Sequence, residues 1–307
     1  MSGQVPDVVV TLLRGYVRRT PGAVLKGDLV RSFLNERLRD EPRQRVVDAV
    51  LDARFAVDTR DLIQRYLYLF GVWEPHMTAW LRRRLRPGDG FVDVGANIGY
   101  YSVLASRLVG ESGRVVAVEA SADFHRRLLQ NVRLNDCRNL RAVNAAVSDR
   151  EETLKFTLAS SANMGANSIV PYDGAAESVF EVDAHPLPSL LESSEIAAAR
   201  VIKIDVEGAE GAVVRGLLPL LPDLRDDVEI TVEVTPERMA QLGDSADELL
   251  DAMTSHGFHV YRLVNEYAAE SYPRALSGPP AVPTRWRGPI EAESDLIFSR
   301  VDAEQLP

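Results

Sequence analysis

The chain has 307 residues, 46% of them hydrophobic, so it can bury a large core, and we expect one domain with an appendage. Its formal net charge is −10 and it has no basic cluster beyond Arg82–Arg84. This argues against a nucleic-acid partner, because such binding depends on neutralising phosphates. The single cysteine, Cys137, excludes an internal disulfide, and we expect a cytoplasmic protein. The apolar run at residues 8–13 is too short to span a membrane and lacks the features of a signal peptide, so no membrane partner is expected.

Residues 1–70 are expected to form a helical N-terminal cap. Two groups of apolar residues recur there at spacings of three and four, which is typical of a buried helical face. Pro42 separates the two groups. The first group is Leu29, Val30, Phe33, Leu34 and Leu38, and the second is Val46, Val47, Val50 and Leu51.

From Trp73 onward, short apolar runs rich in β-branched residues alternate with amphipathic helical patterns. Apolar strands separated by helices are typical of a parallel sheet that is covered on both faces. We therefore expect an α/β domain over residues 71–307. The expected strands are 91–94, 114–119, 140–147, 200–206 and 228–234, followed by 258–263 and 295–300.

An insertion interrupts this alternation after the third expected strand. Residues 153–158 have the pattern of a short edge strand, and a small, polar, glycine-containing stretch follows it. A loop of this length is either disordered or a functional lid, and the sequence leaves both interpretations open. The lid hypothesis covers residues 160–178. The proline-rich segment 273–289 is expected to be a loop.

The stretch GFVDVGANIGYYS, residues 90–102, begins as a buried strand and ends as a helix, with Gly95, Asn97 and Gly99 in the turn between them. Such a turn favours nucleotide binding, because the helix N-terminus offers free backbone N–H groups. Glu119 ends the next strand 20 residues after Gly99, where a carboxylate can bind ribose hydroxyls. The spacing departs from the G-x-G-x-x-G of nicotinamide cofactors, and Asp93 would repel a pyrophosphate. S-adenosylmethionine, which has an adenosine end and a cationic amino-acid end, fits better.

Four segments resemble the FkbM-type methyltransferases in their order and spacing: FVDVGANIGYYS, AVEASADFHRRLLQNVRLN, NAAVSD and VIKIDVEGAEGAVVRGL. The resemblance covers about residues 70–262. It implies a Rossmann-like class I methyltransferase fold, with a mostly parallel seven-stranded sheet whose last strand is antiparallel. It also implies methylation of hydroxyls on sugars, macrolides and other secondary metabolites. Ala120 stands where the family usually has proline, which would loosen the turn after Glu119.

The resemblance also assigns cofactor-binding residues by position. It puts Asn144 and Ala145 beside the adenine, and Glu74 near the methionine end of the cofactor. Glu74 could instead only favour the dipole of the following helix, and Asp93 could cap its own turn. The full expected set is Glu74, Asp93, Gly95, Asn97, Gly99, Glu119, Asn144 and Ala145.

Three carboxylates are the expected catalytic residues. Asp205 and Glu207 end the fourth strand, where ligands bind in open α/β sheets, and residues two apart on an extended segment point the same way. Lys203 shares that side and could pair with one of them, while Glu233 ends the fifth strand. Either a carboxylate takes the proton of the acceptor hydroxyl, or Asp205 and Glu233 hold a Mg²⁺ ion that acidifies it.

The expected function is therefore O-methyl transfer from S-adenosylmethionine to a hydroxyl of a small-molecule acceptor, a sugar or a secondary metabolite such as a macrolide or glycoside. A nicotinamide-dependent oxidoreductase would need a Tyr/Lys or His/Asp proton relay near the end of the sheet, and the sequence offers none there. A cofactor-binding protein without catalysis is the third interpretation. The identity of the acceptor and the oligomeric state, a homo-oligomer included, stay open.

Overall fold

A computed structural model describes residues 7–158, 167–168 and 178–306. Its centre is a sheet in the order β13-β12-β14-β11-β10-β3-β4-β5, in which β5, β4, β3, β10 and β11 run parallel. Strand β14 lies antiparallel between β11 and β12. The expected mostly parallel, Rossmann-like sheet with an antiparallel last strand is confirmed, and the two-residue β13 adds an eighth strand at its edge. The strands are β3 Gly90–Val94, β4 Arg114–Val118, β5 Leu140–Val143, β10 Ala199–Ile204, β11 Glu229–Val234, β12 His259–Leu263, β13 Thr284–Arg285 and β14 Ser294–Ser299.

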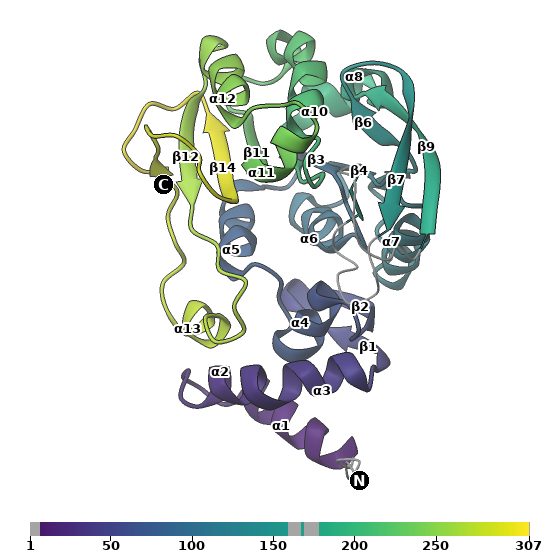
Figure 1. Cartoon of the computed structure of the whole chain (residues 1–307), viewed down its shortest axis with the longest axis vertical. Coiled ribbons are helices and arrows are strands. Elements are labelled where there is room, and N and C mark those ends of the chain that lie inside the picture. Colours follow the sequence, from purple (N-terminus) through teal and green to yellow (C-terminus); the bar gives the residue numbers. More distant parts are fainter. Residues whose placement is uncertain (1–6, 159–166, 169–177, 307) are drawn as a thin grey trace.

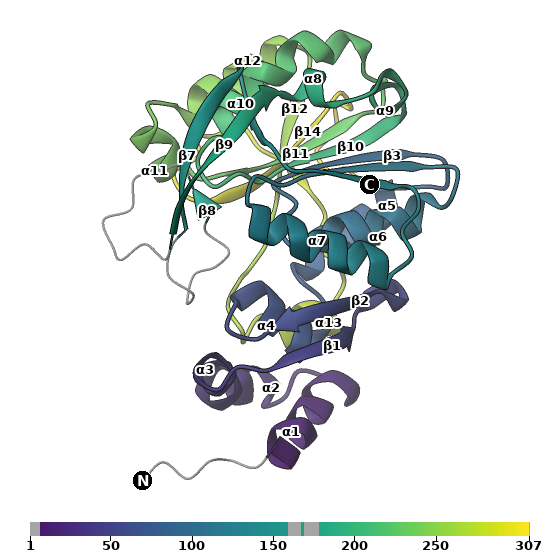
Figure 2. The same cartoon turned by 90° about the vertical axis from the view of Figure 1, so that its right-hand side faces the viewer.

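Helices cover both faces of this sheet (Figure 2). All five residues of β3 and all six of β14 are buried, so neither strand alternates between buried and exposed positions. The face toward the N-terminal cap carries α5 Pro75–Arg84, α6 Tyr100–Val109 and α7 Ala122–Leu134. The opposite face carries α8 Leu187–Leu190, α9 Ser193–Ala198, α10 Glu210–Leu217 and α12 Ala246–Ser255, while α11 Pro236–Gln241 follows β11.

The N-terminal cap is not wholly helical, as Figure 1 shows. The second expected helix is wrong, because the residues around Val46 and Val47 form a strand of an antiparallel hairpin. Val46 is 55% exposed and Val47 only 4%, which is the alternation of a strand with one buried face. The expected helical face at Val50 and Leu51 is instead the turn of this hairpin, where Leu51 has a φ of 58°. The elements are α1 Asp7–Arg19, α2 Lys26–Leu29, a π-helical turn Val30–Leu34, α3 Asn35–Asp40, β1 Gln44–Asp48, β2 Arg54–Asp58 and α4 Leu62–Phe70.

A second, smaller sheet lies beside the carboxyl edge of the central one, in the order β6-β9-β7-β8. The expected edge strand at 153–158 is confirmed as part of β7. The single expected strand 140–147 is wrong, because β5 pairs with β4 and β6 pairs with β9 in the other sheet. Residues 159–166 and 169–177 lie outside the described part of the chain, so the lid expected at 160–178 falls almost wholly outside it. The strands are β6 Ala146–Ser148, β7 Glu152–Leu158, β8 Asn167–Ser168 and β9 Ser178–Pro186.

The segment between β12 and β14 returns to the cap and carries α13 Tyr272–Ser277, which lies near α2 and α5 (Figure 1). Here the Tyr66 hydroxyl of α4 donates to the backbone oxygen of Tyr267 at 3.0 Å. The ring of Tyr272 packs against Tyr66 and Phe70. Segments of the chain about 200 residues apart in the sequence therefore pack against each other here. Among the described residues, no helix has the length and apolar character to cross a bilayer.

Candidate functional site

A cavity of about 380 Å³ opens at the carboxyl ends of β3, β4, β10 and β11. Its volume is within the range of small-molecule sites. Its wall includes residues from outside the central sheet, among them Leu62 of the cap, Phe156 of β7 and Tyr267 after β12. The arrangement follows from the topology, because the ends of adjacent parallel strands meet at one edge.

The glycine turn after β3 has a packing requirement of its own. Gly95 and Gly99 have φ angles of 83° and 82°, in the left-handed region that favours glycine. A Cβ atom on Gly95 would lie 1.7 Å from the backbone oxygen of Asp205, and one on Gly99 would lie 2.3 Å from Leu128. Both glycines are therefore needed to seat the turn against β10 and α7. Gly95 also lines the cavity, whereas Gly99 does not.

The Glu119 carboxylate braces this turn from the end of β4. One oxygen accepts the backbone N–H of Asn97 at 2.7 Å, and the other accepts that of Ser121 at 2.8 Å. Burial raises the pKa of Glu119 to about 7, although these two N–H groups favour its ionised form. Each carboxylate oxygen keeps a free lone pair, so Glu119 can bind a ligand hydroxyl while it holds the turn.

Asp93 is 1% exposed beneath the turn, and its carboxylate accepts the Ser102 hydroxyl of α6. Burial raises its pKa, and the nearby Lys203 ammonium opposes that change. The side chain lines the cavity. An anionic group would have to approach a buried carboxylate here, whereas a cation would be attracted.

The acids of β10 and β11 form a hydrogen-bonded chain with Lys203. The Lys203 ammonium is 2.7 Å from an Asp205 carboxylate oxygen, and Asp205 in turn hydrogen-bonds to Glu233. Burial alone would raise the pKa of Asp205, but the Lys203 ammonium, the hydrogen bonds with Glu233 and Lys203, and the Arg238 charge together outweigh it, and the pKa is lowered. Burial and the Asp205 charge together raise the pKa of Glu233 well above its ordinary value. The pair therefore shares one proton, with the charge on Asp205.

Glu207 lies beside this pair in a strained backbone conformation, with a φ of 59°. The guanidinium of Arg238, on α11, forms an ion pair with it. Asp205, Glu207 and Glu233 each offer an oxygen within 4.8 Å of the others. The three expected catalytic carboxylates are thus brought together.

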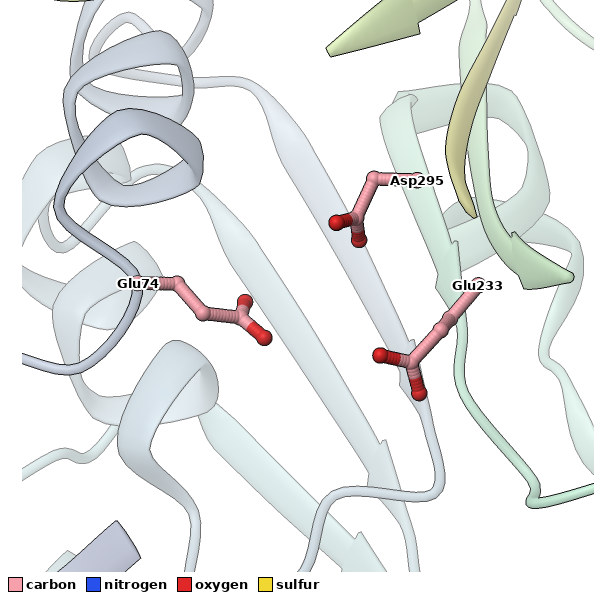
Figure 3. Close-up of side chains that lie close together, drawn as sticks. All are labelled: Glu74, Glu233 and Asp295. Atoms are coloured by element: carbon pink, nitrogen blue, oxygen red, sulfur yellow. The ribbon is translucent and has the colours of Figure 1, made fainter. Parts of the chain in front are cut away.

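A second set of buried acids faces the same end of the cavity. Figure 3 shows the carboxyl groups of Glu74, Glu233 and Asp295 pointing toward one another from three different segments, with oxygens within 4.8 Å. The Tyr267 hydroxyl lies 2.7 Å from Glu233 and 3.1 Å from Glu74, and the Tyr101 hydroxyl donates to Glu74. Burial raises the pKa of Glu74, Glu233 and Asp295.

Most of the residues expected from the sequence line the cavity, but two do not. The side chain of Asn144 donates to the backbone oxygens of Glu119 and Ala120, so it secures the turn after β4 from outside. Gly99 packs against α7. The members of the expected set that line the cavity are Glu74, Asp93, Gly95, Asn97, Glu119, Ala145, Asp205, Glu207 and Glu233.

Sequence reasoning missed four groups around these acids: Ser102, Arg238, Tyr267 and Asp295. For Asp295 a signal existed, because an antiparallel strand begins at the edge where its parallel neighbours end. Tyr267 carried no such signal, since it lies in an irregular segment whose path depends on tertiary contacts.

A family model described as the methyltransferase FkbM domain matches residues 93–260, more than half of the chain. No curated protein sequence matches. Three similar solved structures are precorrin-6y C5,15-methyltransferase from Geobacter metallireducens, fibrillarin from Aeropyrum pernix with natively bound S-adenosyl-L-methionine, and a SAM-dependent O-methyltransferase from Thermotoga maritima.

Identities to these three are 14%, 14% and 12%, with TM-scores of 0.40, 0.39 and 0.41. The alignments cover 72%, 73% and 85% of this chain, and 86%, 73% and 78% of the respective structures. The assignment rests on the family model, whose range contains the glycine turn, Glu119, Asp205 and Glu233. The chain therefore belongs to the FkbM family of S-adenosylmethionine-dependent methyltransferases.

Proposed function

We propose that the protein transfers the methyl group of S-adenosylmethionine to a hydroxyl of a small-molecule acceptor, a sugar or another secondary metabolite. One observation carries this proposal. A single cavity joins the turn braced by Glu119 to the proton-sharing pair Asp205 and Glu233. A cofactor site and a group able to take a proton thus face the same enclosed space.

The residues of the cavity fit this cofactor in charge and in shape. Glu119 has lone pairs left for the ribose hydroxyls, and Ala145, Val147 and Leu154 offer an apolar wall to the adenine. Asp93 and Glu74 suit the cationic methionine end. When bound, S-adenosylmethionine supplies an activated methyl group and a neutral thioether as the leaving group.

Asp205 is the proposed base. Lys203 and the hydrogen bond with Glu233 favour the ionised form of its carboxylate, so it could accept the proton of an acceptor hydroxyl that attacks the methyl group which the bound cofactor would supply. Glu233 hydrogen-bonds to Asp205 and fixes its orientation. The walls of the cavity align the acceptor and limit access of water, which is the main requirement of an in-line displacement.

Mg²⁺ is the alternative activator of the acceptor. The three carboxylates lie close enough to share an ion, but Lys203 already pairs with Asp205 and Arg238 with Glu207. A divalent cation would have to displace both of these cations, which favours the base over the metal. A chelator should leave the rate of methyl transfer unchanged. A rate that falls with the chelator and recovers when Mg²⁺ is added would instead support the metal.

A nicotinamide cofactor fits less well. Its pyrophosphate would lie over the turn above buried Asp93, where the two charges repel. The ammonium of Lys203 does lie against the Tyr101 ring, 5.1 Å from its centroid, but the Tyr101 hydroxyl donates to Glu74. A Tyr/Lys proton relay needs a tyrosine hydroxyl that faces the substrate, and the Tyr101 hydroxyl is bound to Glu74 instead.

Isothermal titration with S-adenosylmethionine, S-adenosylhomocysteine and NAD tests the proposal. We expect heat of binding from the first two and none from NAD. Release of S-adenosylhomocysteine in the presence of hydroxylated acceptors then separates an enzyme from a protein that only binds the cofactor. Binding of NAD in preference to S-adenosylmethionine would overturn the proposed function.

A further inference from the structure

The cavity extends beyond the part suited to the cofactor, toward β11 and β14. Glu233 is the penultimate residue of β11 and Glu293 directly precedes β14, so both stand at least two strands away from the turn after β3. Neighbouring strands are about 4.8 Å apart, so this end lies roughly 10 Å from the turn. The cap-side wall of this end is aromatic, because Trp73 and Tyr267 both line the cavity and stack with ring centroids 5.5 Å apart.

The lining of the cavity contains many more acidic than basic groups. Among the described residues that line the cavity, only Lys203 and Arg238 are basic, and both already pair with acids of the same wall. The cofactor does not balance the excess, since its sulfonium and ammonium are offset in part by its own carboxylate. The acids of the lining are Glu74, Asp93, Glu119, Asp205, Glu207, Glu233 and Glu293.

We propose, on the basis of the function proposed above, that the methyl acceptor is a hydroxylated amine, of which an amino sugar is the simplest class. An ammonium group donates three hydrogen bonds to carboxylates and is attracted to aromatic faces. Glu293 offers a carboxylate and the Trp73 and Tyr267 rings offer aromatic surface in the same cavity, while Glu233, hydrogen-bonded to the Tyr267 hydroxyl, adds a further oxygen acceptor. An acceptor that carries phosphate or carboxylate would meet no unpaired cation among the described lining residues.

The amine proposal gives a role to Glu293, which has no role in the methyl-transfer chemistry. It is exposed at the mouth of the cavity, and within the described part of the chain no hydrogen bond or ion pair engages its side chain. Asp295, two residues on, is 8% exposed and directed at Glu233 (Figure 3). The strand start at β14 therefore brings one free and one buried carboxylate to the acceptor end.

Three methyl glycosides of matched size test the acceptor class: those of D-glucosamine, N-acetyl-D-glucosamine and D-glucuronic acid. Each is titrated into protein saturated with S-adenosylhomocysteine, at a pH of about 6.5 so that the amine carries its proton. We expect the ammonium sugar to bind at least ten times more tightly than the acetamide sugar, because the uncharged acetamide cannot form charge-assisted hydrogen bonds. The carboxylate sugar should not bind.

Glu293→Gln should weaken binding of the ammonium sugar about threefold, the scale of an exposed ion pair, and leave that of the acetamide sugar unchanged. Glu291→Gln, an exposed acid two residues earlier that does not line the cavity, is the matched control. Equal binding of the ammonium and acetamide sugars, or binding of neither while S-adenosylhomocysteine still binds, would overturn the amine assignment and leave the proposed function standing. Failure of S-adenosylhomocysteine to bind would overturn the proposed function itself.

Discussion

Glu119 has two tasks at the level of the single residue. It holds the glycine turn through Asn97 and Ser121, and we propose that it also binds the ribose. The two tasks are compatible because a carboxylate accepts more than two hydrogen bonds. They also mean that a substitution here changes the turn as well as the contact with the ligand.

Glu119→Gln should weaken binding of S-adenosylhomocysteine by about 1.5–3 kcal/mol, because an amide replaces a charged acceptor with one oxygen and one N–H donor. Isothermal titration measures this loss. Glu111→Gln, an exposed acid before β4 at the opposite edge of the sheet, is the control and should bind normally. An unchanged affinity of Glu119→Gln would remove Glu119 from the ribose.

Asp205→Asn should lower the rate of methyl transfer by about 10² or more, the scale of a lost general base. Cofactor affinity should persist, since Glu119 and the turn serve that ligand. Lys203 loses its closest partner but keeps Asp93 and Glu74 nearby, so the fold should survive with a lower melting temperature. S-adenosylhomocysteine release and calorimetry separate these effects, with Asp251→Asn, at an exposed position of α12, as the control. Full activity of Asp205→Asn would refute the assignment of the base.

At the level of the element, α10 begins with a buried acid that we expect to weaken the fold at neutral pH. Glu210 is 1% exposed, and one of its oxygens accepts the N–H of Gly208 at 2.9 Å. Its other oxygen has no hydrogen-bond partner among the described residues. Burial raises the pKa of Glu210 to about 7, against 4.5 for an ordinary glutamate.

Between pH 4.5 and 7 the folded state therefore holds a proton at Glu210 that the unfolded state has lost. The free energy of unfolding falls as the pH rises through this window, by up to about 3 kcal/mol for this one group. Glu210→Gln should be more stable than the wild type at pH 8 and should have a shallower pH slope in urea denaturation. Glu237→Gln, an exposed acid in the first turn of α11, should show neither change. Identical slopes for Glu210→Gln and wild type would contradict the raised pKa.

Strand ends explain how much of the site could be predicted from the sequence. Glu119 and Asp205 directly follow β4 and β10, and Glu233 is the penultimate residue of β11. The carboxyl ends of these parallel strands share one edge, which brings the three acids together. Tyr267 could not be predicted, because its position depends on stacking against Trp73 and on the Tyr66 hydroxyl. The prediction of a helix where the cap forms its hairpin was wrong for a different reason. Its valines recur at a helical spacing only because the turn at Val50 and Leu51 interrupts the strand alternation.

At the level of the whole molecule, the cap and the central domain share one core. The same cluster of buried apolar residues includes Leu34 and Phe55 of the cap, Trp80 of α5 and Tyr261 of β12. Phe55 of β2 contacts the Tyr100 ring of α6, with centroids 5.6 Å apart. We therefore expect the two parts to unfold together.

Phe55→Ala should destabilise the protein by about 3–5 kcal/mol, the usual cost of removing a fully buried phenylalanine side chain. Circular dichroism and tryptophan fluorescence should report one coincident transition in the variant, as in the wild type. Val46→Ala, at an exposed position of the same hairpin, should change stability little. Separate transitions for the two probes would mean that the cap melts by itself.

The hydrogen bond between Glu74 and Tyr267 joins residues 193 positions apart. Ribosomes add about 5–20 residues per second, so roughly 10–40 s pass between synthesis of the two partners. A nascent chain that has just finished β11 already holds the turn, Glu119, Asp205 and Glu233, but it has neither Tyr267 nor Asp295. The acceptor end of the pocket is thus the last part of the site to be completed during synthesis.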